Sequence, residues 1–157
     1  MKFTKSSLYS LGLLMISMVG CESAEKPPAR YARETHKLEA YLQTMHLSIP
    51  EDSTSFLFIS ENGCGNCIAK SFDFFSGISS ARIMLSKGAV SRYLTHYSFD
   101  TLKATVIIDS SEQVNRLAFH RGNVGVVSVS HGKIDTIVYI EYPTLREQLR
   151  SIRIAGR

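Results

Sequence analysis

The sequence predicts an α/β fold in which a mixed central sheet carries helices on both faces. Three observations support this prediction. Apolar runs of strand length alternate with segments of helical periodicity between residues 31 and 119. Two runs rich in branched residues then flank a polar turn at 131–133, which is typical of a hairpin. A last helical pattern follows the hairpin. Strands that alternate with helices are expected to be parallel, and a hairpin adds an antiparallel pair of strands. The sheet is therefore expected to be mixed.

The first half of the chain is predicted to contain two helices and two strands. Apolar residues at spacings of three and four indicate a helix from about Tyr31 to Met45. The continuous apolar run at 55–60 is typical of a strand buried on both faces. A helix is expected from about Cys64 to Phe75, ended by Gly77, and residues 81–86 are expected to form the second strand.

The second half is predicted from weaker helical patterns and clearer strands. Residues 89–97 and 110–119 are expected to be helices, the latter with Ser110 or Ser111 at its start. Residues 104–109 are rich in branched side chains and are expected to form a strand. The hairpin strands are expected at 124–130 and 134–142. Pro143 should lie in the first turn of the final helix, which runs to about residue 152.

The first twenty residues have the layout of a secretory signal. Lys2 and Lys5 precede an apolar run from Leu8 to about Val19, which is too short to span a bilayer comfortably. The ending "MVGC" resembles the bacterial lipoprotein signal, with Met18 where that signal usually has leucine. The resemblance implies cleavage before Cys21 and attachment of lipid to Cys21. The alternatives are an ordinary signal peptide with Cys21 unmodified, or an uncleaved anchor.

The chain is therefore divided into a signal peptide at 1–20, a tether at 21–30 and one domain at 31–157. We expect a lipid-anchored protein of the cell envelope that faces the periplasm or the cell exterior. Loss of two lysines with the signal lowers the formal net charge from +4 to +2. No run of five or more basic residues remains, which argues against nucleic acid as a partner.

The motif "ENGCGNC" carries the candidate chemistry. A thiol at the first turn of a helix has its thiolate stabilised by unpaired N–H groups, which lowers the pKa of the thiol. Cys64 occupies that place, and Cys67 follows one turn later on the same face, where it can resolve a mixed disulfide at Cys64. Outside the cytoplasm the two are expected to form a disulfide.

Other uses of the two cysteines fit the sequence less well. A zinc site needs about four ligands, and the five histidines show no finger-like spacing that would complete one. Haem attachment needs histidine after the second cysteine, where Ile68 stands. A disulfide across two residues constrains little of the unfolded chain, yet an inert disulfide stays an alternative. We expect no metal and no cofactor.

A strand leading into C-x-x-C at the start of a helix, followed by "KATVIIDSSEQVNRLAFHRGNVGVVSVSHGKI", resembles the thioredoxin-like superfamily. The likeness covers roughly residues 53–153 and is greatest to the membrane-anchored, exported branch. It implies a thioredoxin-like three-layer αβα sandwich with an extra N-terminal helix and an inserted strand–helix between residues 78 and 102.

The sequence departs from the family pattern at three positions. Phe58 stands where thioredoxin has a buried carboxylate, and Gly63 stands where the family has an aromatic residue. Val124 matches the position of the family's cis-proline. Because a cis bond before a non-proline residue costs roughly 2.5–4 kcal/mol, we expect a trans bond there.

The sequence thus favours an exported thiol–disulfide oxidoreductase that acts on exported protein thiols or disulfides, or with a membrane electron donor. The first alternative is a non-catalytic lipoprotein that serves as a binding module in a cell-envelope assembly. The second is delivery of a metal. His120 and His131 are expected at the surface, and Asp109 is expected to accept hydrogen bonds in a turn.

Overall fold

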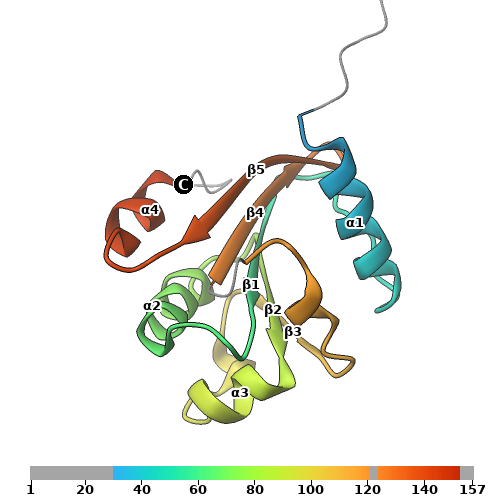
Figure 1. The fold of residues 1–157 in the computed structure, drawn as a ribbon. Coiled ribbons are helices and arrows are strands. Elements are labelled where there is room, and N and C mark those ends of the chain that lie inside the picture. The colour runs from blue at the N-terminus through green and yellow to red at the C-terminus, as the bar shows by residue number, and fades with distance from the viewer. Residues whose placement is uncertain (1–29, 121–123, 153–157) are drawn as a thin grey trace, which may run out of the picture.

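The computed structural model describes residues 30–120 and 124–152 as a five-stranded mixed sheet with four α-helices (Figure 1). The strand order is β3-β2-β1-β4-β5. In chain order the elements are α1 (Ala32–Gln43), β1 (Thr54–Ile59), α2 (Gly65–Ser76), β2 (Ala81–Ser86), α3 (Lys87–Tyr93), β3 (Thr105–Asp109), β4 (Val124–Ser130), β5 (Lys133–Ile140) and α4 (Leu145–Ser151). Short 3-10 turns occupy Phe99–Thr101 and Gln113–Arg116. The predicted α/β class with a mixed sheet is confirmed.

Strand β1 lies at the centre of the sheet, with β2 parallel on one side and β4 antiparallel on the other. Five of its six residues are buried, as the apolar run predicted. Its last residue, Ile59, lies opposite Leu85 of β2 and Val124 of β4. The chain therefore leaves the middle of the sheet just before the cysteine motif.

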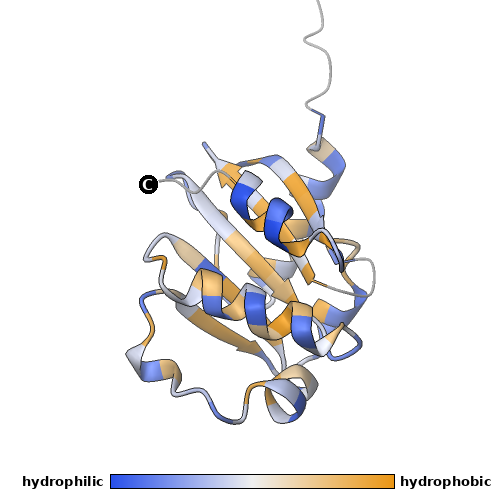
Figure 2. Cartoon of the chain, turned by 90° about the vertical axis from the view of Figure 1, so that its left-hand side faces the viewer, coloured by the Kyte–Doolittle hydropathy of each residue, from blue (hydrophilic) through white to orange (hydrophobic). Residues whose placement is uncertain are grey.

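The two faces of the sheet are covered by different helices, so the molecule has two apolar cores. On one face, α1 packs against Phe56 and Phe58. On the other, α2 and α4 pack against Leu57 and Ile59. Alternate residues of β1 thus enter opposite cores, as the two-residue period of a strand requires. Figure 2 looks onto the α2–α4 side, where each helix alternates polar and apolar segments above a largely apolar sheet.

The predicted helix at 110–119 is wrong; only the 3-10 turn Gln113–Arg116 forms there. The cause is Asp109, whose carboxylate accepts hydrogen bonds from the backbone N–H groups of Ser111 at 2.9 Å and Val114 at 2.7 Å. Glu112 between them has a positive φ of 57°. An acidic side chain that bonds to the backbone in this way competes with helix formation. Its expected role as a turn acceptor is confirmed.

Three smaller expectations also differ from the structure. The helix predicted at 89–97 is α3, which begins earlier because the Ser86 hydroxyl caps it by accepting from the Ala89 N–H at 3.0 Å. Pro143 precedes α4 rather than lying in its first turn, and it follows a cis peptide bond from Tyr142. Strand 81–86, expected within an inserted unit, lies inside the sheet, and β3 forms the edge.

Candidate functional site

The side chain of Cys64 caps the N-terminus of α2. Its backbone is extended, with φ −64° and ψ 116°, and Gly65 is the first helical residue. The backbone N–H of Cys67 donates to the Cys64 sulfur at 3.4 Å. The sulfur therefore occupies the place that serine or threonine oxygens take at helix starts, where N–H groups lack partners in the helix. The placement of Cys64 predicted from the sequence is confirmed.

The two sulfur atoms lie in different environments. Cys64 is partly exposed, whereas Cys67 has no exposed surface and belongs to the core between α2 and the sheet. Both residues are thiols in the structure. One thiol can therefore meet a second molecule, while the other is shielded behind it.

Hydrogen bonding separates the acidities of the two thiols. The pKa of Cys64 is lowered chiefly because the Cys67 thiol donates a hydrogen bond to its sulfur, with the N–H groups of Cys67 and Asn66 adding to the effect. Burial, followed by its hydrogen bond to Cys64, raises the pKa of Cys67 to about 11. The thiolate therefore forms first on the exposed sulfur, which is the arrangement expected of a nucleophile and a resolving thiol.

Hydrogen bonds from side chains of α3 hold the loop before Cys64 in place. The hydroxyl of Tyr93 donates to the carbonyl oxygens of Glu61 and Gly63, both at 3.3 Å. A guanidinium nitrogen of Arg92 donates to the same Glu61 oxygen at 3.2 Å. The ring of Tyr93 also lies over Gly65, where an added Cβ would meet ring carbons at 3.2 and 3.3 Å. These contacts fix the turn that places the sulfur at the helix start.

The loop between β5 and α4 approaches Cys67. The backbone N–H of Tyr142 donates to the sulfur of Cys67, which partly offsets the rise in the pKa of that thiol. The amide of Gln148 fixes this loop, because it accepts from the Glu141 N–H and donates to the Tyr139 carbonyl, both at 2.8 Å. The sequence analysis did not identify Tyr93, Tyr142 or Gln148, since each is far from the motif along the chain.

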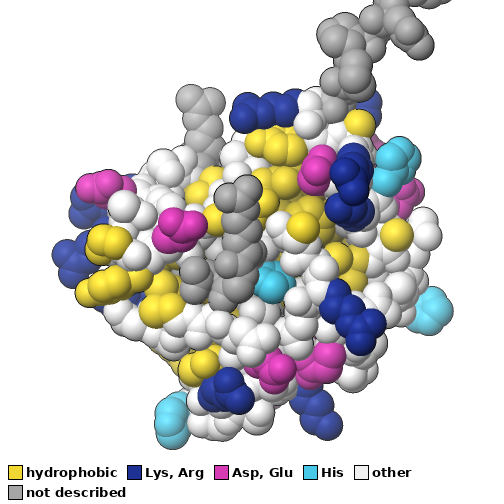
Figure 3. Space-filling view, in the orientation of Figure 1, with side chains coloured by type: hydrophobic (Ala, Val, Ile, Leu, Met, Phe, Trp, Pro, Cys, Tyr) yellow, Lys and Arg dark blue, Asp and Glu magenta, His cyan; other side chains and the backbone are white. Residues whose placement is uncertain are grey.

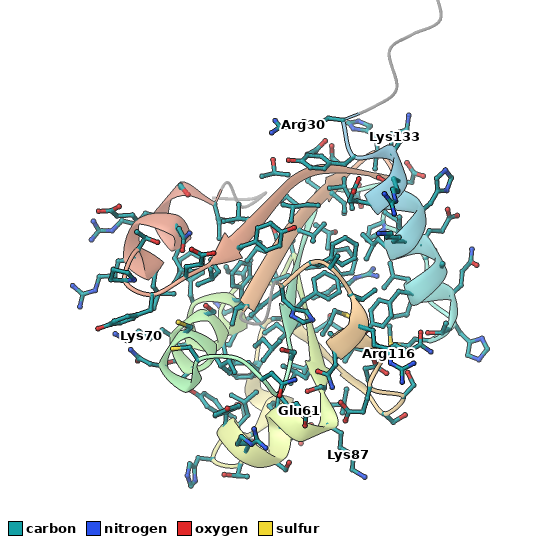
Figure 4. The ribbon with its side chains drawn as sticks, in the orientation of Figure 1. Arg30, Glu61, Lys70, Lys87, Arg116 and Lys133 are labelled. Carbon is teal, nitrogen blue, oxygen red and sulfur yellow. The ribbon has the colours of Figure 1, made fainter. Side chains whose placement is uncertain are left out.

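The thiol pair lies at the end of the molecule opposite to the start of α1. Figure 4 shows Glu61, which precedes Cys64 by three residues, at the end occupied by α3, while Arg30 and Lys133 lie together at the other end. Near Lys133, the Ile134 N–H donates to the Thr35 hydroxyl at 3.2 Å. The described chain therefore begins beside the hairpin turn, away from the cysteines.

The other residues singled out by the sequence lie apart from this pair. His120 is 6% exposed, and its Nε2 lies 2.7 Å from the Val114 carbonyl oxygen, so the expected surface position is wrong. Burial beneath the start of β4 explains this, since Gly125 leaves room for the backbone of residues 119 and 120. His131 lies exposed in the hairpin turn, as expected. Cys21 and the peptide bond before Val124 lie outside the described residues.

Asp109 and Tyr41 form a buried pair on the opposite face of the sheet. The Tyr41 hydroxyl donates to the Asp109 carboxylate at 3.2 Å, and both residues are almost fully buried. Burial, followed by the nearby negative charge, raises the pKa of Tyr41. The pair joins α1 to β3. It stabilises the fold and does not contact the cysteines.

Within residues 30–120 and 124–152, no three histidine, cysteine or acidic side chains lie close enough together to hold a metal ion. Two surface hollows of about 470 and 380 Å³ are lined by residues other than Cys64 and Cys67. On the face drawn in Figure 3, acidic and basic side chains are interspersed.

Comparison with known proteins gives no match, whether with family models, curated proteins or solved structures. In the part of the chain that the structure describes, no helix has the length and apolar character needed to cross a membrane.

Proposed function

We propose that this chain is an exported, lipid-anchored thiol–disulfide oxidoreductase of thioredoxin-like fold that acts through Cys64 and Cys67. The observation that carries the proposal is the contrast between the two thiols. Cys64 is partly exposed at a helix start with a lowered pKa, and the Cys67 thiol beside it is buried with a raised pKa. This contrast matches the two steps of disulfide exchange.

In the first step, the Cys64 thiolate attacks one sulfur of a partner disulfide. A bond forms between Cys64 and that sulfur, and the partner's other sulfur leaves as a thiolate that takes up a proton. In the second step, the Cys67 thiol gives its proton to water and attacks the Cys64 sulfur. The partner's first sulfur then leaves as a thiolate. Two electrons have passed from the cysteine pair to the partner, and the pair has become a disulfide; the reverse sequence oxidises a partner dithiol.

The order of the strands also supports a thioredoxin-like fold. Strand β1 precedes the cysteine helix, β2 is its parallel neighbour, and the antiparallel β4–β5 hairpin on its other side leads into a last helix. The sequence resemblance implies the strand before the cysteine helix, the hairpin and the last helix, but it assigns residues 81–86 to an insertion, whereas the structure has them as the central parallel neighbour of β1. Strand β3, which the resemblance takes as the family's strand, lies at the edge of the sheet, and α1 covers the opposite face.

The proposal predicts different outcomes for substitution of each cysteine. Cys64→Ser should abolish exchange with a model disulfide, because it removes the nucleophile. Cys67→Ser should also abolish turnover, but it should accumulate a mixed disulfide at Cys64, since the resolving sulfur is absent. Mass spectrometry of the intact protein after mixing with oxidised glutathione distinguishes the two. Full turnover by either variant would refute the proposal.

A non-catalytic binding module is the second candidate, and Phe58 favours it. This residue is fully buried, and its ring lies 5.2–6.1 Å from the rings of Phe119, Phe56 and Tyr41. By the sequence resemblance, Phe58 stands where thioredoxin carries a proton-transferring carboxylate; its ring lies in the core on the α1 face, opposite to the core that contains Cys67. The binding-module proposal expects an unreactive Cys64–Cys67 disulfide of very low reduction potential. Measurement of the reduction potential by equilibration with glutathione decides between the two candidates.

A further inference from the structure

Tyr93 contacts the residues on both sides of Cys64. Its hydroxyl hydrogen is shared between two carbonyl oxygens, those of Glu61 and Gly63, each 3.3 Å from the hydroxyl oxygen. Its ring lies against Gly65, the residue after Cys64, where an added Cβ would meet ring carbons at 3.2 and 3.3 Å. One side chain therefore restrains the backbone both before and after Cys64.

The helix that carries Tyr93 is fixed by its own contacts. The Ser86 hydroxyl caps α3 by accepting from the Ala89 N–H, and Ala89 has no exposed surface. Leu94, directly after Tyr93, is buried in the same core as Cys67. The Tyr93 ring packs against that core as well. The ring is therefore a fixed support rather than a mobile surface side chain.

We propose that Tyr93 is a positioning residue for disulfide exchange, which keeps the Cys64 sulfur at the N–H groups of the first turn of α2. This inference rests on the proposed exchange reaction and adds a residue to its site. A peptide bond is planar, so holding the Gly63 carbonyl oxygen also sets the direction of the bond from N to Cα in Cys64. The ring against Gly65 restrains the chain on the other side. The Cys64 side chain thus starts from a backbone with little freedom to move.

The chemistry at the sulfur depends on this restraint. The Cys67 N–H donates to the Cys64 sulfur at 3.4 Å, and the hydrogen bonds at this sulfur lower the pKa of Cys64. A hydrogen bond weakens steeply when its donor, hydrogen and acceptor fall out of line. A small rotation of the turn would therefore reduce the stabilisation of the thiolate. In this role Tyr93 acts through the backbone that flanks Cys64.

The test is the substitution Tyr93→Phe, which removes the hydroxyl, keeps the ring and changes no charged group. In the reduced protein with Cys21→Ser, the alkylation rate of Cys64 by iodoacetamide at pH 6 should fall about threefold, within the range for one lost hydrogen bond, because less thiolate is present. At pH 10 the thiolate predominates in both proteins, so the rates should agree within about twofold. The pH of half-maximal rate therefore rises. Because a less stable thiolate disfavours the dithiol, equilibration with glutathione should favour the disulfide about threefold more in the variant.

Tyr97→Phe provides the matched control. The Tyr97 hydroxyl donates to the Asp73 carboxylate at 2.6 Å, and its ring packs edge-on against Phe72 with the ring centres 4.6 Å apart. Tyr97 thus restrains the later part of α2, as Tyr93 restrains the turn before it. Its substitution should change neither the pH of half-maximal alkylation nor the glutathione equilibrium. A merely structural role of Tyr93 predicts the same for Tyr93→Phe, with a loss of stability in urea as its only effect.

An unchanged pH of half-maximal alkylation in Tyr93→Phe would overturn the inference, and so would an equal rise in Tyr97→Phe. The failure of this inference is distinguishable from the failure of the proposed function, because reduction of hydroxyethyl disulfide by the wild type tests the exchange chemistry alone. If the wild type reduces this compound and Tyr93→Phe leaves the alkylation profile unchanged, only the role of Tyr93 is refuted. If the wild type does not reduce it, the proposed function is refuted, and the positioning role in exchange falls with it.

Discussion

At the scale of single residues, the chemistry of the site depends on one hydrogen bond between two thiols. Cys67 is the main cause of the lowered pKa of Cys64, because both its thiol and its backbone N–H donate hydrogen bonds to the Cys64 sulfur. Burial keeps the Cys67 proton in place, so that this thiol remains a donor while Cys64 ionises. The buried cysteine thus contributes to the reactivity of the exposed one before it takes part as the resolving thiol.

This dependence predicts how the reactivity of Cys64 changes with pH. Alkylation of the reduced protein by iodoacetamide should reach half of its maximal rate at a pH below that of an unperturbed cysteine, because the thiolate is the reacting form. Cys67→Ala removes the thiol donor and should shift this midpoint upward. Cys67→Ser keeps a hydroxyl donor and should shift it less.

The measurement is the rate of alkylation at Cys64 between pH 5 and pH 10, followed by mass spectrometry, with Cys21→Ser as the common background. A midpoint that stays the same in Cys67→Ala would contradict the assigned cause of the lowered pKa.

At the scale of secondary-structure elements, the close approach of one turn to β4 depends on a glycine. A Cβ added at Gly125 would lie 1.6 Å from the Phe119 carbonyl oxygen, a separation that no side chain can occupy. Gly125 pairs with Phe58 of β1 and with Tyr139 of β5. Any shift of β4 to relieve the clash would disturb the centre of the sheet. The segment that contains His120 therefore depends on the missing side chain.

Two glycine substitutions test this contact. Gly125→Ala should lower the free energy of unfolding by about 3 kcal/mol or more, since the backbone must move. Gly77→Ala is the matched control, because a Cβ there meets no atom within 4 Å and the residue has a negative φ of −82°. It should change stability by about 0.5 kcal/mol or less.

Urea unfolding followed by circular dichroism measures both variants. Similar losses in the two variants would show that the approach of residues 119 and 120 to β4 is not what requires Gly125.

At the scale of the whole molecule, the cysteine pair and the start of the described chain lie at opposite ends. The hairpin turn and the first turn of α1 meet through Ile134 and Thr35, whereas β1 runs toward the cysteines (Figure 1). A lipid anchor at Cys21 would therefore hold the domain by the end remote from the thiols. The pair would then be accessible to exported partners on the side away from the anchor.

The proposed anchor predicts that lipid is attached at Cys21. In cells fed an alkyne-labelled fatty acid, the wild-type chain should carry the label and sediment with the membranes. Cys21→Ala should lose both properties, because no other residue receives the lipid. Cys64→Ala and Cys67→Ala should keep both, which separates the anchor from the redox pair. Label that remains on the Cys21→Ala chain would disprove the assignment.

The sequence alone determined the class of fold, most strands and the placement of Cys64 at a helix start. It could do so because buried strands and helix faces leave periodic patterns, and because a cap depends on residues close together in the chain. It could not predict the extent of a helix where a side chain accepts hydrogen bonds from backbone N–H groups that the helix would otherwise use. Asp109 does this at 110–119.

Only the tertiary structure decided which distant residues surround the thiol pair. Tyr93 comes from α3, and Tyr142 and Gln148 come from the far end of the chain, at positions that no local pattern marks. The packing of α2, α3 and α4 into the core on one face of the sheet brings these residues together. The burial of Cys67 and the acidity of Cys64 follow from that packing, because a pKa depends on the neighbours in space rather than on those in sequence.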